Sequence, residues 1–446
     1  MRRSLWLLAL GVPFIGTLAN TAVPGSRFLA TEPDSVPFSY EVGAVRVIQR
    51  INAANDAVAV NIYLLGGARQ LTPATQGIEA LYLAAAELGT REHAGTASRE
   101  RWSETGSRSF RESTWDWSVI GFRGLRQDFD SSWNILAARI AHPTLRATDV
   151  ALARDRLISA IRMQRESPDG ELHLLADSIA FAGSLYALRP EGTEGSLRSM
   201  DSATVAAYVS SQVVQSRLLV VVVGNVTRGD VEQAVRRVFG SLPKGSYTWT
   251  PQVAAAQTTA SLTLFSRPFE TNYLIGVFDG PERGSEDYEA FNLATSLLGG
   301  AIGGIVRGAE GLSYVATAGV RARARASGEL YVTTTKPDTV VALIRRVIER
   351  VKSMGVGTFY TAALSEAKVQ ERWYRSQTNG LIADALAEAH ILRGDFRLAT
   401  AAAHVRDLSS GTTRTAANKY FKNFHFVYLG DTTVVRRETF TKIEKP

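Results

Sequence analysis

The residues best suited to hold an extended peptide lie in one stretch, Leu298–Tyr314, which reads LGGAIGGIVRGAEGLSY. Two glycine pairs interrupt it: Gly299, Gly300, Gly303 and Gly304. Glycine lets a backbone approach another chain closely, while Arg307 offers five fixed donors and Tyr314 a hydroxyl. Such a loop could receive a peptide. The same residues could equally form a helix C-terminal cap followed by a turn, and both interpretations stay open on this stretch alone.

Metal chemistry within this chain is not indicated. The sequence has no cysteine, and its histidines are scattered without any pair at helical spacing: His93, His142, His173, His390, His404 and His425. A metal helix needs donors three or four residues apart on one face. The sequence therefore predicts no metal site and no cofactor in this chain.

Composition indicates a soluble globular protein of two to three domains. The chain has 446 residues, of which 45% are hydrophobic and 21% charged, which gives ample core. The formal charge is +7, but no run of Lys or Arg concentrates it. We therefore expect no nucleic-acid partner.

The N-terminus is typical of a secretory signal. Arg2 and Arg3 precede an apolar run, Leu5–Leu18, that is too short to span a membrane. Small residues at Thr17 and Ala19 predict cleavage after residue 19, with an uncleaved anchor as the alternative. Without cysteine, disulfides and a lipid-modified cysteine are excluded. The sequence predicts a periplasmic or secreted protein with no stable membrane span.

The pattern of predicted elements repeats along the chain. Residues 202–226 and 410–432 each contain a Ser/Thr-opened helix, a strand, and a glycine at the strand end, Gly224 and Gly430. Strands are expected at 41–50, 58–65, 113–122 and 218–223, and helices at 77–88, 129–140, 150–164, 200–210 and 228–239. We interpret residues 38–240 and 260–446 as two similar α/β halves, with 241–259, rich in small and polar residues, as the linker.

Several segments together resemble the pitrilysin or insulinase-like zinc peptidases, which include mitochondrial processing peptidase and the bc1 core proteins. The segments are VGAVRVIQRINAANDAVAVNIYLLGGARQ at 42–70, Gly77 and Gly89-Thr90, Asp116, and the Leu298–Tyr314 stretch. The resemblance covers the chain from about Phe38 to the end. It implies an α+β fold in which two halves, each a mixed, mainly antiparallel sheet backed by helices, close like a clamshell around a peptide.

The resemblance also shows that the zinc site is lost. The family binds zinc through an H-x-x-E-H helix and a distal Glu. Anchored on the glycines, these positions fall on Ala80, Leu83, Ala84 and Ala160. None has a donor atom, so a lone active peptidase is not expected.

Two other features near the lost motif are ambiguous. Glu79 and Glu87 flank it, and we interpret them as ordinary helix charges. In the family, Asn and Ala usually precede the strand that pairs with the peptide, and these positions here are Phe110 and Arg111, so peptide binding by the first half is in question.

The second half keeps Arg307 and Tyr314 seven residues apart. The resemblance implies that this pair stabilises the oxyanion of a peptide held at zinc, here the zinc of another chain. We therefore expect a non-catalytic subunit of a heterodimeric peptidase, with a zinc-bearing partner of the same family and peptide substrates. The alternatives are a structural role for the pair, with Tyr314 packed on a strand and Arg307 capping a helix, and a non-proteolytic scaffold protein.

The arginines at 321, 323 and 325 alternate with alanine, which predicts that they share one strand face. They could line a chamber that attracts acidic peptides, or form a solvated edge guarded by charge.

Overall fold

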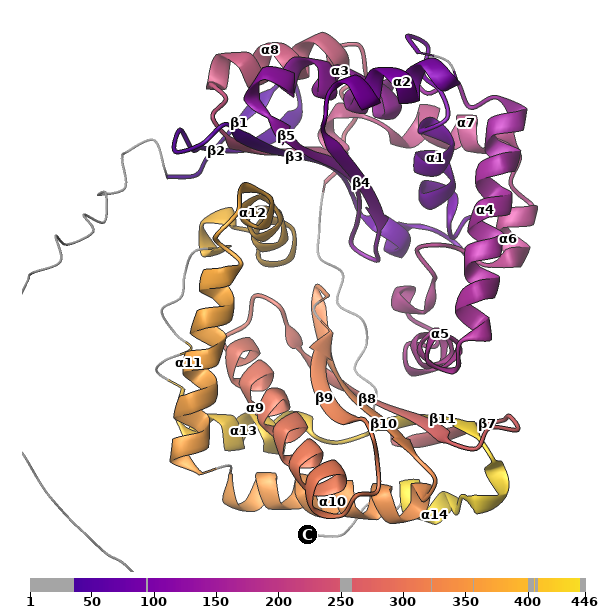
Figure 1. Ribbon diagram of the computed structural model, residues 1–446, viewed down its shortest axis with the longest axis vertical. Helices are drawn as coiled ribbons and strands as arrows, with labels where there is room; N and C mark the ends of the chain where they lie inside the picture. Colours follow the sequence, from indigo (N-terminus) through magenta and orange to yellow (C-terminus); the bar gives the residue numbers. More distant parts are fainter. Residues whose placement is uncertain are drawn as a thin grey trace, which may run out of the picture.

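The computed structural model describes residues 36–441, apart from 94, 249–258, 322, 356, 400–404 and 406–407. The predicted signal at 1–19, most of the predicted linker and His404 lie outside the described residues. The described chain forms two mixed sheets, each covered by helices (Figure 1). The predicted fold class is confirmed.

The first sheet has six strands in the order β1-β2-β6-β3-β5-β4. Only the β2–β6 pair is parallel. The strands are β1 (Phe38–Val42), β2 (Val45–Ile51), β3 (Ala57–Leu65), β4 (Arg108–Ser113), β5 (Trp117–Leu125) and β6 (Leu218–Gly224). The helices are α1 (Ile78–Ala86), α2 (Thr96–Glu104), α3 (Phe129–Ala141), α4 (Ala147–Glu166), α5 (Pro168–Ala180), α6 (Glu194–Arg198), α7 (Ser202–Gln212) and α8 (Arg228–Phe239).

The second sheet has five strands in the order β7-β11-β8-β10-β9. Its one parallel pair is β7–β11. The strands are β7 (Ser261–Ser266), β8 (Asn272–Glu282), β9 (Ala316–Arg321), β10 (Arg325–Thr334) and β11 (His425–Gly430). The helices are α9 (Asp287–Ile302), which continues as a π-helix at Gly303–Ala309, then α10 (Pro337–Met354), α11 (Thr358–Tyr374), α12 (Asn379–Arg393), α13 (Ser410–Tyr420) and α14 (Arg437–Thr441).

The predicted repeat is visible as matching topology. The order β2-β6-β3-β5-β4 in the first sheet matches β7-β11-β8-β10-β9 in the second. In both halves a capped helix, α7 or α13, precedes the second strand of the parallel pair, β6 or β11. Both strands end on a glycine with positive φ, 149° at Gly224 and 156° at Gly430, a conformation that residues with a side chain rarely adopt.

Two of the predicted strands were wrong in extent. The single strand expected at 41–50 is a hairpin, because Gly43 takes a φ of 66° and turns the chain between β1 and β2. The strand expected at 113–122 begins only at Trp117, and residues 114–116 form the turn from the edge strand β4. In both cases one apolar, β-branched run concealed a tight turn.

Each half sends a helix onto the sheet of the other. Helix α5 of the first half packs on β8 and β11, and α12 of the second half packs on β3 and β6. Figure 1 shows α4 and α11 running along opposite sides to deliver these helices. Ile382, Leu386 and Ala387 of α12 share one buried cluster with Tyr63 and Val221 of the first sheet. The halves are therefore joined by packed apolar cores as well as by the linker.

Candidate functional site

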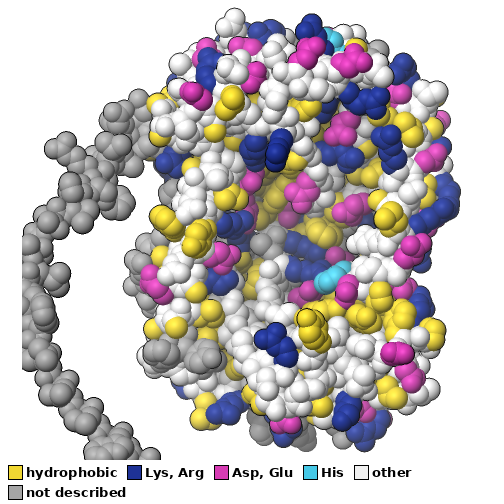
Figure 2. Space-filling model, viewed as in Figure 1, with side chains coloured by type: hydrophobic (Ala, Val, Ile, Leu, Met, Phe, Trp, Pro, Cys, Tyr) yellow, Lys and Arg dark blue, Asp and Glu magenta, His cyan; other side chains and the backbone are white. Residues whose placement is uncertain are grey.

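A chamber of about 840 Å³ lies between the halves. The edge strand of each sheet contributes to its wall: Glu112 on β4 from one side, and Ala318, Gly319 and Val320 on β9 from the other. Figure 2 shows the molecule hollowed here, with charged side chains around the opening. Two unpaired strand edges beside one cavity are suited to receive an extended peptide by strand addition.

Helix α1, which corresponds to the family's metal-binding helix, is fully buried. Ala80, Leu83 and Ala84 are all buried on α1, and Leu83 and Ala84 belong to the main core of the first half. Ala160 is exposed on α4, and the α4 residues that join this core are Ile158 and Ile161. Alkyl side chains at these positions cannot hold zinc. Within the described ranges, no group of three His, Asp or Glu is arranged to bind a metal ion. The metal content of the protein stays a prediction.

The interpretation of Glu79 as an ordinary helix charge was wrong. Glu79 is only 1% exposed. Its carboxylate forms an ion pair with Arg217 and accepts hydrogen bonds from the hydroxyls of Ser118 at 2.5 Å and Tyr208 at 2.6 Å. A buried carboxylate is stable only when paired and hydrogen-bonded. Glu79 therefore anchors α1 from inside the core.

Glu87 behaves as expected of a charge at a helix end. It lies just after α1, is partly exposed, and pairs with Arg111 of β4 at 3.2 Å. Phe110 and Arg111 were expected to precede the edge strand of the first sheet, but they lie inside it, in β4. The ring of Phe110 packs under the guanidinium of Arg123.

Asp116 lies in the β4–β5 turn at the floor of the chamber. It is buried, pairs with Arg69 at 2.7 Å and accepts a hydrogen bond from the hydroxyl of Tyr186. It also accepts the backbone N–H of Ala324 from the second half at 3.3 Å. Burial raises the pKa of Asp116, and Arg69 opposes that shift. The residue thus ties the two halves together.

Arg307 and Tyr314 both lie on the surface of the second half. Arg307 is exposed in the π-helix that follows α9, and Tyr314 is 88% exposed just before β9. Within the described chain, no hydrogen bond or ion pair holds either side chain. The alternative in which Tyr314 packs on a strand is therefore wrong. Neither residue lines the chamber.

The four glycines divide into two kinds. A Cβ on Gly299 would lie 2.5 Å from the backbone oxygen of Ala318, and one on Gly303 would lie 3.1 Å from that of Ala316. These two glycines let α9 lie directly on β9. A Cβ on Gly300 or Gly304 would meet nothing within 4 Å. One glycine of each pair is thus needed for packing, and the other leaves open backbone surface.

The arginine series at 321–325 does not share one strand face. Arg321 ends β9, Arg325 begins β10, and Arg323 lies in the turn between them. The expectation of a solvated edge was also wrong, because Arg323 is 4% exposed and stacks 3.7 Å over the ring of Trp115 in the first half. Arg321 and Arg323 do line the chamber.

Sequence reasoning missed the residues that hold this arginine turn. Asp177 of α5 pairs with both Arg321 and Arg323, the latter at 3.0 Å. Arg321 also pairs with Glu329 of β10 and donates to Nδ1 of His173 at 2.8 Å. We call these five residues the latch, because they join α5 of the first half to the second sheet. No local spacing marks Asp177, and only the alternation of arginines hinted at the site.

Comparison with known proteins gives a family match for part of the chain and a fold match for most of it. Residues 199–368 match the family described as "Peptidase M16 inactive domain". A curated relative is the "Uncharacterized zinc protease YmxG" of Bacillus subtilis, 22% identical over 275 residues. That alignment covers 60% of this chain and 66% of the relative. This chain thus spans slightly under two thirds of the length of that relative.

Solved structures agree on the fold. A peptidase M16 inactive domain from Pseudomonas fluorescens superposes with a TM-score of 0.81 at 18% identity, covering 89% of this chain and 98% of that one. The periplasmic protease PqqL from Escherichia coli superposes with a TM-score of 0.73 at 11% identity, covering 89% of this chain and 48% of that one. The resemblance is confirmed: residues 199–368 match the inactive-domain family of the M16 peptidases, the chain shares the fold of these solved structures, and its helix α1 carries no zinc motif.

Proposed function

We propose that this chain is the non-catalytic subunit of an exported, heterodimeric zinc peptidase. In this role it offers Arg307 and Tyr314 in trans to a peptide held at the zinc of a partner of the same family. The observation that carries the proposal is the exposure of this pair, because both side chains lie free on the surface of the second half. Tyr and Arg are the residue types that most often dominate protein interfaces.

The state of the first half supports an action in trans. Its metal-helix positions are apolar and buried, so a peptide bond in this chain's own chamber would meet no zinc. An exposed Arg and Tyr stabilise an oxyanion only where another chain generates one. The predicted signal segment and the likeness to a periplasmic protease support export.

The test is reconstitution with a zinc-bearing relative from the same cell. The purified chain alone should contain no stoichiometric zinc by elemental analysis and should cleave no peptide. The mixture should cleave a peptide that neither protein cleaves alone, or cleave it much faster than the relative alone. In the complex, Arg307→Ala or Tyr314→Phe should lower kcat by about 100- to 1,000-fold, the effect of removing one oxyanion donor.

Matched variants separate this role from general surface effects. Arg350→Ala and Tyr374→Phe alter exposed residues of the same half and should leave kcat unchanged. Zinc content and complex assembly should be the same in all four variants. Full activity of both Arg307→Ala and Tyr314→Phe in a correctly assembled complex would exclude the trans role.

A second candidate function is a non-proteolytic scaffold, and the latch favours it. The buried pairing of Arg323 with Asp177 holds the halves in contact across the chamber, as expected of a rigid structural subunit. A scaffold would form a stable complex with its partner without any gain in peptide hydrolysis. The reconstitution experiment therefore decides between the two functions.

A further inference from the structure

A second, smaller cavity opens beside the chamber, between α11, α12 and strand β2. Its volume is about 90 Å³, enough for several water molecules and thus for a carboxylate or phosphate group. Five arginines and one glutamate line it: Arg50, Arg283, Arg372, Arg375, Arg393 and Glu388. We call this cavity the arginine pocket. Arg283, Arg375 and Glu388 also line the chamber, so the two cavities share a wall.

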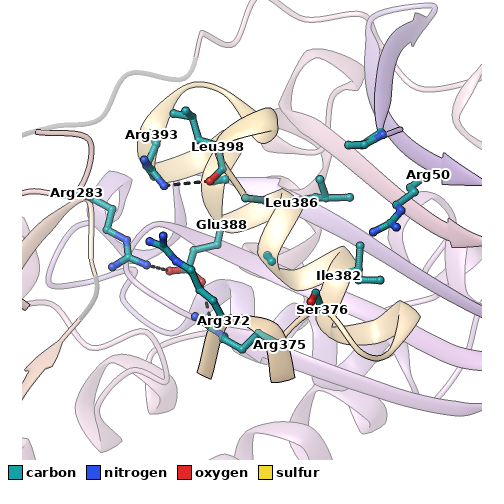
Figure 3. Close-up of a pocket in the computed structure, with 14 residues that line it drawn as sticks. Arg50, Arg283, Arg372, Arg375, Ser376, Ile382, Leu386, Glu388, Arg393 and Leu398 are labelled. Atoms are coloured by element: carbon teal, nitrogen blue, oxygen red, sulfur yellow. Dashed lines mark hydrogen bonds and ion pairs between the residues drawn. The ribbon is translucent and has the colours of Figure 1, made fainter. Parts of the chain in front are cut away.

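Arginines outnumber carboxylates in the lining of this pocket. Glu388 pairs with both Arg283 and Arg375, the latter at 3.3 Å. Arg372 pairs with Glu289. Figure 3 shows Arg283, Arg372 and Arg375 directed toward Glu388 beneath α12. Two carboxylates, Glu388 and Glu289, therefore face three guanidiniums on this side of the pocket.

Negative charge offsets the two remaining arginines of the pocket, Arg393 and Arg50, less than it offsets Arg283, Arg372 and Arg375. Arg393 donates to a neutral acceptor, the backbone oxygen of Leu398, at 3.2 Å. Arg50 reaches the pocket from β2 of the first half, on the opposite side of α12 in Figure 3. The Nε atoms of Arg50, Arg283 and Arg393 are all buried without a hydrogen-bond acceptor in the described chain. Such desolvated, partly unpaired cations are costly without a further negative charge.

The electrostatics point the same way. Burial lowers the pKa of Arg393, and Arg372 lowers it further, while Glu289 and Glu388 raise it. Burial likewise lowers the pKa of Arg283, and Glu388 and Glu289 oppose this. The pocket thus disfavours its own positive charges, and an added anion would offset that cost.

We propose that the arginine pocket binds an oxyanion, either a carboxylate or a phosphate group. Guanidinium groups match both through paired, charge-assisted hydrogen bonds. The anion has two possible sources: a free small ion, or the carboxylate of a peptide lying in the adjoining chamber. The second source rests on the proposed function, and the first does not.

The first experiment uses the full chain alone and inorganic phosphate, with chloride at equal ionic strength as the reference. Phosphate should raise the melting temperature and bind measurably by calorimetry. Arg393→Gln should weaken binding about tenfold or more, while Arg393→Lys should weaken it less, because the charge is kept although the paired guanidinium bonds are lost. Arg162→Gln is the matched control. It changes an exposed arginine of α4 that pairs with Glu194 of α6, and it should bind phosphate as the wild type does.

A variant of opposite sign sharpens the test. Glu388→Gln removes the carboxylate that occupies Arg283 and Arg375, so phosphate should bind more tightly than in the wild type. Glu349→Gln, at an exposed glutamate on α10, should have no effect. If Glu388 only held the helices together, its variant would lose stability without any gain in affinity, which would count against the proposal.

Peptides then distinguish the sources. A peptide that ends in a free carboxylate is compared with the same peptide ending in an amide, each with and without phosphate as competitor. Preference for the carboxylate, abolished by phosphate and by Arg393→Gln, assigns the site to a chamber-bound peptide. Phosphate binding without such a preference assigns it to a free ion. Absence of both, or equal weakening by Arg162→Gln and Arg393→Gln, would overturn the site while leaving the trans role of Arg307 untouched.

Discussion

The two halves use the same topological position in opposite ways. The helix after the second core strand of the repeat is α1 in the first half and α9 in the second. Every residue of α1 is buried. Helix α9 instead runs on into a π-helix that leaves Arg307 exposed, with Tyr314 exposed further along.

The difference shows what replaces a lost site. The motif positions on α1, Ala80, Leu83 and Ala84, are buried apolar residues, and the buried pair of Glu79 and Arg217 anchors this helix. Arg307 and Tyr314 in the second half have no comparable structural role, since neither side chain is held by a partner in the described chain. Burial explains why the α1 positions are apolar. It does not explain why Arg307 and Tyr314 have their residue types.

Among the variants considered, we expect the largest loss of stability in the first half when one partner of its buried ion pair is removed. Arg217→Leu leaves the Glu79 carboxylate buried and unpaired, and we expect a loss of about 3–5 kcal/mol in the free energy of unfolding. Glu79→Leu should cost a similar amount, and the double variant should cost less than the sum. Urea unfolding followed by tryptophan fluorescence measures each.

A surface pair provides the reference for that cycle. Arg162→Leu breaks an exposed contact with Glu194 and should cost far less stability than Arg217→Leu, because solvent screens exposed charges. If Arg217→Leu costs no more than this, the view that Glu79 anchors α1 is wrong.

The glycines allow a finer comparison within the second half. Gly299→Ala places a methyl group 2.5 Å from the Ala318 oxygen, and should destabilise the protein by about 1–3 kcal/mol through overpacking. Gly300→Ala, the next residue on α9, meets open space and should stabilise by about 0.5–1 kcal/mol because alanine favours a helix. Thermal unfolding of the two variants side by side gives the signs, and equal effects would contradict the division of the glycines.

The latch predicts a smaller, pH-dependent effect. Burial raises the pKa of Glu329, and Asp177 also raises it, while Arg321 and His173 oppose the shift. Because the folded pKa exceeds the unfolded one, the stability contributed by this carboxyl is full below the unfolded pKa and is lost as pH rises through the folded pKa. The wild type should therefore lose stability relative to Glu329→Gln as pH increases from about 4, near the unfolded value.

Unfolding of the two proteins across this pH range measures the effect. The exposed Glu349→Gln serves as the control and should differ from the wild type by a constant amount. A wild-type advantage over Glu329→Gln that grows with pH would contradict the direction of the shift.

The sequence by itself determined the features that depend on neighbouring residues. The side chain of Asp201 caps α7 by accepting the N–H of Thr204 at 2.8 Å, as the pattern predicts. Helix α8 spans Arg228–Phe239, as its hydrophobic period predicts, and the repeat could also be predicted from residue types and spacing. The fold class and the loss of the zinc motif followed from the resemblance to a known family. Helix caps, periodic hydrophobic patterns and motifs depend on residues close together in the sequence, so they can be predicted without the tertiary structure.

Only the tertiary structure decided which charged side chains are buried and which residues they pair with. Glu79 meets Arg217 across 138 residues, and Arg321 meets Asp177 across 144. The exchange of α5 and α12 between the halves, the latch and the arginine pocket all arise from such distant contacts. Whether a charge is solvated or buried depends on what the fold places beside it, and that partner lies too far along the chain for any local pattern to reveal.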